Sequence, residues 1–117
     1  MRAVALKAGR LSEIVDVQNT LKALQHFVGG YIEAIPFPGV PGAVILVDEE
    51  GKLTGKPANR PIRTTTGETL DWLVGDALVV GTNGEEFTDL TEQEAETIAR
   101  RCRMPLGALL EEVIGND

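Results

Sequence analysis

The sequence predicts a single α+β domain: a mostly antiparallel sheet of about five strands, one helix in the N-terminal half and two helices at the C-terminus. Three observations predict this class. Short apolar runs separated by glycine-containing turns fill most of residues 1–81, a helical repeat interrupts them at residues 20–28, and helical spacing follows Thr91. At 117 residues the chain is long enough to bury about two thirds of its unfolded surface in one core.

The first elements are two strands and a helix. Residues 2–7 and 12–17 are short apolar runs joined by a segment that contains Gly9, which predicts a β-hairpin. The helix over residues 20–28 has Asn19 or Thr20 to bind its first amides and Gly29 for a left-handed end; its predicted apolar face consists of Leu21, Leu24, Phe27 and Val28. A strand over residues 31–35 follows Gly30.

The middle of the chain supplies the predicted centre of the sheet. Residues 43–47 (AVILV) are apolar without interruption, which predicts a central strand covered on both faces. Leu53 and Thr54 continue as a short returning strand, and residues 55–63 are expected to be irregular because of their prolines. Residues 68–74 fit a strand or a short helix equally well, and residues 77–80 predict a buried strand.

The C-terminal part is predicted to be helical. Thr91 and Glu94 have the spacing of a capping box, with Leu90 and Ala95 in the positions of a hydrophobic staple. This helix should end near Met104 because a proline follows. A second short helix is predicted from the spacing of Leu106, Leu109, Leu110, Val113 and Ile114.

Charge is distributed unevenly along the chain. The net charge of −7 argues against non-specific nucleic-acid binding, which depends on Lys and Arg. Residues 1–66 carry a balance of +2 and residues 67–117 a balance of −9. Such a split either steers a protein partner or reflects two ordinarily solvated faces. An unpaired strand edge would also allow two copies to form a homodimer.

Location follows from two absences in the sequence. The single cysteine, Cys102, excludes an intramolecular disulfide and a cysteine-based zinc site, which favours a reducing compartment. No apolar run approaches the roughly 18 to 20 residues that cross a bilayer, and the N-terminus lacks the long apolar segment of a signal peptide. We therefore expect a cytoplasmic protein without membrane association.

The most suggestive chemical feature is a basic segment at residues 52–63. Lys52, Lys56, Arg60 and Arg63 occur there without any acidic residue, on a loop that two prolines, Pro57 and Pro61, stiffen. Cations on a pre-organised loop can bind phosphate or carboxylate, whereas the alternative is a solvated basic loop. The segment is not a phosphate-binding P-loop because Pro57 stands where Ser or Thr should follow the lysine.

No catalytic or metal site is predicted. His26 is the only histidine and falls on the polar face of its helix, while Cys102 falls on the apolar stripe of the C-terminal helix as a structural thiol. The carboxylates have no spacing typical of a calcium loop or a catalytic pair. We expect neither cofactor nor enzymatic activity. Trp72, the only tryptophan, is expected to be partly buried, or to anchor an interface if it is exposed.

Several short pieces occur in an order that resembles a known family. They are LKALQHFVGGYIEAI, AVILV, Asp-Glu-Glu-Gly-Lys-Leu, Pro-x-Asn-Arg and LVGDALVVG. Together they resemble domain of unknown function 3846, found in small proteins of phages, plasmids and actinobacterial or firmicute genomes. The resemblance covers roughly residues 1–85 and leaves residues 86–117 as an acidic helical extension. It implies a phage or mobile-element origin, implies no catalytic residues, and directs attention to Asn59 and Arg60.

These observations lead to one expected function and one alternative. We expect a non-enzymatic phage or mobile-element protein that binds a host or phage protein. The alternative is a phosphate or nucleotide binder whose ligand-binding residues are Lys52, Lys56, Asn59, Arg60 and Arg63.

Overall fold

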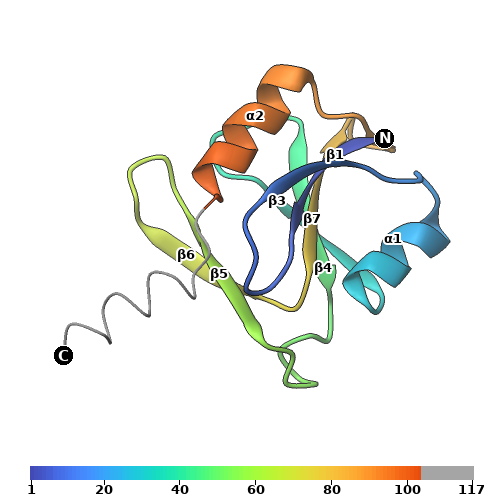
Figure 1. The fold of residues 1–117 in the computed structure, drawn as a ribbon, viewed down its shortest axis with the longest axis vertical. Helices are drawn as coiled ribbons and strands as arrows, with labels where there is room; N and C mark the ends of the chain where they lie inside the picture. Colours follow the sequence, from blue (N-terminus) through green and yellow to red (C-terminus); the bar gives the residue numbers. More distant parts are fainter. Residues whose placement is uncertain (104–117) are drawn as a thin grey trace.

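The computed structural model describes residues 1–103, and a six-stranded antiparallel sheet forms its centre (Figure 1). The strands follow the order β2-β1-β7-β4-β3, and β8 pairs with β7. These strands are β1 (Arg2–Leu6), β2 (Glu13–Asp16), β3 (Ile32–Pro36), β4 (Ala43–Asp48), β7 (Ala77–Thr82) and β8 (Phe87–Thr88). A separate antiparallel hairpin contains β5 (Ala58–Arg63) and β6 (Thr69–Val74).

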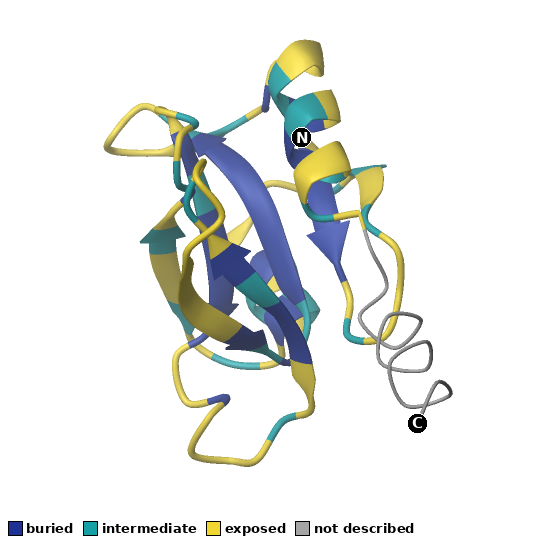
Figure 2. Cartoon of the chain, turned by 90° about the vertical axis from the view of Figure 1, so that its left-hand side faces the viewer, coloured by how far each residue is buried: buried dark blue, intermediate teal, exposed yellow. Residues whose placement is uncertain are grey.

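Each face of the central sheet has its own cover. The helix α1 (Leu21–Val28) packs Leu24 and Val28 on one face, against Ala3, Ala5, Leu46, Leu78 and Val80. The helix α2 (Glu92–Arg101) and the β5–β6 hairpin cover the other face, where Ile62, Leu73, Ala95 and Ile98 join Val4, Leu6, Ile45, Val47 and Val79. Figure 2 shows that the long central strands are buried between these layers.

Most of the predicted elements are confirmed. The fold is α+β with antiparallel pairing, and β4 is an interior strand covered on both faces. Thr20 caps α1 by accepting a hydrogen bond from the amide of Ala23, and Gly29 ends it with a left-handed φ of 78°. The capping box of α2 is present, because Thr91 and Glu94 each accept a hydrogen bond from the other's amide.

Four details differ from prediction. Eight strands occur within residues 1–103 rather than about five, and β8 was not predicted. The open segment at residues 68–74 is a strand, whereas Leu53 and Thr54 lie in a turn. Leu21 is 63% exposed because only the face with Leu24 and Val28 meets the sheet. The helix α2 ends at Arg101 rather than near Met104; the second predicted helix lies outside the described residues.

Candidate functional site

The basic segment at residues 52–63 contains a strand, which corrects the expectation of an irregular loop. Pro61 is tolerated within β5 because, within residues 1–103, this strand has a strand neighbour on one edge only. The pairing with β6 is also irregular on both sides of Pro61 and Ile62, where the register shifts. A turn at residues 49–55 precedes the strand. The segment therefore begins in a turn and continues as the strand β5.

Asn59 and Arg60 lie inside the protein, with exposures of 1% and 2%. The amide group of Asn59 donates to the carbonyls of Leu6 at 2.6 Å and Gly75 at 2.7 Å. Its oxygen accepts a hydrogen bond from Nε of Arg60 at 2.7 Å. The two side chains thus join β5 to the end of β1 and to the turn before β7. The prediction that both residues lie on a loop is therefore wrong, because they are buried in the strand β5.

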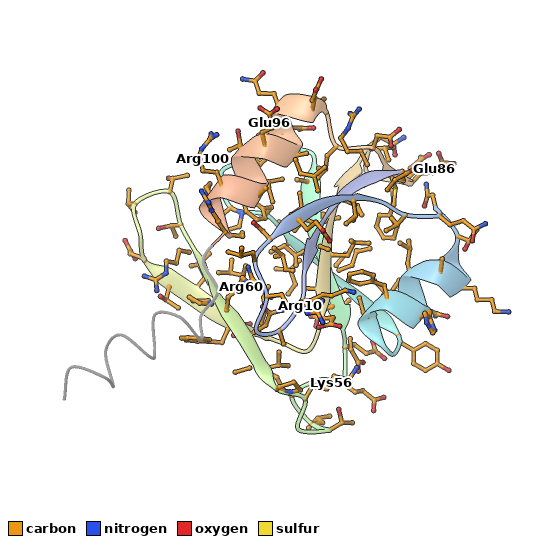
Figure 3. The ribbon with its side chains drawn as sticks, viewed as in Figure 1. Arg10, Lys56, Arg60, Glu86, Glu96 and Arg100 are labelled. Atoms are coloured by element: carbon orange, nitrogen blue, oxygen red, sulfur yellow. The ribbon has the colours of Figure 1, made fainter. Side chains whose placement is uncertain are left out.

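The guanidinium of Arg60 is bound by backbone carbonyls rather than by a carboxylate. It donates to the carbonyls of Lys7, Arg10 and Cys102, which belong to the β1–β2 turn and the end of α2. Figure 3 shows Arg60 beside the turn that carries Arg10. Burial lowers the pKa of Arg60 from its ordinary value, although an arginine remains charged at neutral pH. Arg60 therefore holds three segments together.

The two lysines of the segment are also engaged within the protein. Nζ of Lys56 lies 2.7 Å from a carboxylate oxygen of the buried Asp48 and donates to the carbonyls of Val28 and Gly29. Lys52 forms an exposed ion pair of 2.7 Å with Asp71 on β6. The groups that bind the two lysines are not the groups that bind Arg60. The structure therefore does not bring Lys52, Lys56, Asn59, Arg60 and Arg63 together in one site.

A cavity of about 220 Å³, here called the arginine cavity, lies beside β5 and the turn that follows it. Arg60, Arg63 and Arg101 contribute its positive charge. The remaining lining residues are Phe37, Pro61, Ile62, Thr64, Thr65, Gly67 and Cys102. Arg60 and Arg63 were predicted as ligand-binding residues from the sequence, whereas Arg101 was not. Arg101 is far from the basic segment along the chain, so the sequence did not indicate that it lines the same cavity.

A second hollow, here called the tryptophan groove, is lined by β6 rather than β5 and has a volume of about 170 Å³. Trp72 lines it and is 42% exposed. Its other lining residues come from β3, β4, the following turn and β6: Glu33, Ile35, Val47, Asp48, Glu49, Lys52, Asp71, Leu73 and Val74. The two hollows share no lining residue.

The strand β6 borders the tryptophan groove with an edge that has no strand partner within residues 1–103. Leu70 and Trp72 both belong to this strand, and both are exposed. The amide of Trp72 donates to the Asp71 side chain at 2.8 Å. The alternation of Leu70 and Trp72 with Thr69 and Asp71 is the sequence signal that would have identified this surface.

The residues considered for catalysis and metal binding are dispersed. His26 is exposed in α1, and Cys102 is half-buried at the end of α2. Burial raises the pKa of the Cys102 thiol, which disfavours a reactive thiolate. Within residues 1–103, no group of three or more His, Cys, Asp or Glu side chains could hold a metal ion. In the same range, no helix is long and apolar enough to cross a membrane.

The fold defines a small antiparallel α+β domain in which a β-hairpin and α2 cover one face of the central sheet. The chain belongs to the family described as Domain of unknown function (DUF3846), whose model matches residues 1–103. This match confirms the family indicated by the order of the sequence motifs, and it includes α2, beyond the residues that carried the resemblance. No curated protein and no solved structure matches the chain.

Proposed function

We propose that this chain is a non-enzymatic protein-binding domain of phage or mobile-element type, which binds a host or phage protein through β6 and the tryptophan groove. The observation that carries the proposal is the exposed Trp72 beside a strand edge that no strand of residues 1–103 pairs with. Tryptophan supplies a large contact area at low entropic cost and is over-represented among residues that dominate binding energy. Leu70 extends this apolar surface along the same strand.

The strand edge favours an extended partner segment. An added strand gains main-chain hydrogen bonds along the edge, while alternate side chains enter neighbouring pockets. The tryptophan groove lies where such side chains would enter, because Trp72 and Val74 of β6 line it. We therefore assign an extended segment of another protein as the occupant.

The charge of the groove favours a basic partner. Its carboxylates are Glu33, Asp48, Glu49 and Asp71, and two of them are paired with lysines. Glu33 and Glu49 are exposed and have no ion-pair partner within residues 1–103. Lys or Arg side chains that flank an apolar residue in the partner would complement these two carboxylates.

Selection from a display library of short peptides tests this proposal. Peptides that bind the wild-type chain are expected to combine Lys or Arg with an apolar residue, and to shift the emission of Trp72, the only tryptophan. Trp72→Ala should weaken their binding by at least about 10-fold, as measured by calorimetry. Leu21→Ala, which removes an even more exposed apolar side chain from α1, should leave binding unchanged.

Charge reversal provides a second, independent comparison. The double variant Glu33→Lys, Glu49→Lys should weaken the same peptides without removing the apolar contact. Peptides that bind wild type and Trp72→Ala equally, or a selection that yields no binding peptide, would overturn the proposal.

A further inference from the structure

We propose that the arginine cavity binds a small phosphate monoester. This inference goes beyond the protein-binding function, because the arginine cavity and the tryptophan groove share no lining residue. It also differs from the basic-loop site expected from the sequence, since Lys52, Lys56 and Asn59 do not line this cavity. Arg60 and Arg63 remain from that expectation, and Arg101 joins them from α2.

The positive charge of the arginine cavity is uncompensated within residues 1–103. All ion pairs within residues 1–103 involve the N-terminus, Lys52 or Lys56, so no carboxylate of this range pairs with any of the three arginines. Arg60 is almost fully buried, and carbonyl oxygens satisfy its hydrogen bonds without neutralising its charge. A buried cation without a counter-charge creates a positive potential in the adjoining cavity, which an anion would relieve.

Arg101 and Arg63 place hydrogen-bond donors at the arginine cavity. Nη1 and Nη2 of Arg101 donate to the carbonyls of Pro38 at 2.6 Å and Arg63 at 3.2 Å, and its guanidinium lies 4.7 Å from the centre of the Phe37 ring. These contacts fix the charge of Arg101 at the cavity wall. The Arg63 side chain is exposed, and its guanidinium makes no hydrogen bond within residues 1–103. Arg63 is therefore free to form the two-pronged contact that arginine makes with phosphate.

The charge and volume of the arginine cavity indicate the kind of anion. Three arginines favour a phosphate monoester, which carries about two negative charges at neutral pH, over a carboxylate with one. Phe37, Pro61 and Ile62 provide an apolar wall for the organic part of the ester. The volume of about 220 Å³ falls below the roughly 300 Å³ at which pockets for larger ligands begin, so the cavity suits a small ester rather than a nucleotide.

Titration calorimetry with phenyl phosphate tests the assignment on the full chain. Wild type should bind phenyl phosphate saturably and more tightly than either inorganic phosphate or benzoate. Arg63→Ala should reduce the affinity at least tenfold. Arg100→Ala removes an equal charge from an exposed position of α2 that does not line the cavity (Figure 3), and should retain the affinity of wild type.

Stability and probe comparisons keep the outcomes distinct. Arg63→Ala and wild type should melt at the same temperature without ligand, because the Arg63 guanidinium makes no hydrogen bond within residues 1–103. The absence of saturable binding to wild type, or equal affinities of Arg63→Ala and Arg100→Ala, would overturn the site. If benzoate bound as tightly as phenyl phosphate, the preference for a phosphate group would be overturned. If inorganic phosphate bound as tightly, the cavity would not recognise the organic part of the ester.

Discussion

Nζ of Lys56 lies 2.7 Å from a carboxylate oxygen of Asp48, and this ion pair joins the end of β4 to the segment before β5. The same nitrogen donates to the carbonyls of Val28 at 2.9 Å and Gly29 at 3.1 Å. Those carbonyls stand at the negative end of the α1 dipole. A Cβ atom at Gly30 would collide with the Asp48 carboxylate. The double glycine after α1 therefore gives the ion pair the space it needs.

Replacing Lys56 by methionine should destabilise the fold by about 2–4 kcal/mol, because Asp48 would be left buried without its cation and two carbonyls would lose a donor. Urea denaturation measures this loss. Lys52→Met is the matched control, since its ion pair with Asp71 is more than half exposed on both sides. We expect that variant to lose less than about 1 kcal/mol. Equal losses in the two variants would contradict the structural role of Lys56.

Acid should weaken the fold partly through Asp48. Hydrogen bonds from Lys56 and from the amide of Glu50 hold the pKa of Asp48 below its ordinary value. The unfolded carboxyl therefore binds a proton at a higher pH than the native one. The stabilisation is complete above the ordinary pKa, and it is lost as the pH falls below about 4 and through the lower native pKa.

The variant Asp48→Asn tests this linkage. Its free energy of unfolding should be lower than that of wild type at neutral pH, and the difference should shrink on acidification through that window. Denaturation curves collected along a pH series measure the difference. A difference that stays constant between neutral pH and the acid limit would show that Asp48 has no altered pKa.

Arg60 should be irreplaceable by lysine. The planar guanidinium of Arg60 donates to the carbonyls of Lys7, Arg10 and Cys102 at the same time. The single ammonium group of a lysine cannot reach all three, so buried carbonyls would be left without donors. We expect Arg60→Lys to lose about 2–4 kcal/mol in urea denaturation. Arg63→Ala, from the same strand, should stay within about 0.5 kcal/mol of wild type. Comparable losses would show that the network around Arg60 contributes little.

The chain should remain monomeric although β6 has an unpaired edge. Pairing two copies through β6 would bring two acidic tryptophan grooves together, and the like charges of Glu33 and Glu49 would oppose this contact. Light scattering should report a monomer, and Trp72 emission should not depend on protein concentration. A dimer with a blue-shifted Trp72 emission would assign β6 to self-association instead.

Local signals in the sequence predicted most of the fold. Thr20, Gly29 and the capping box of Thr91 and Glu94 mark helix ends through bonds between near neighbours, which a sequence displays directly. The strand at residues 58–63 was missed because Pro61 forbids an interior strand but not an edge strand. That distinction depends on tertiary pairing, which local composition does not contain.

The candidate sites were harder to predict for a similar reason. Four cations close together in the sequence suggested one surface. Lys56 and Arg60 instead donate hydrogen bonds to backbone carbonyls up to 53 positions away in the sequence. Arg101 joins the arginine cavity from α2, and Glu33 joins the tryptophan groove from β3. Only the packing of the hairpin on the sheet brings these residues together.

Hydrogen exchange of the chain with a selected peptide bound tests the central claim most directly. If an extended partner pairs with the free edge of β6, amides within residues 69–74 should exchange more slowly in the complex. The amides of β2, an edge strand at the far side of the central sheet, should be unaffected and provide the internal control. Protection at β2 without protection at β6, or a bound peptide that protects neither strand, would contradict the account.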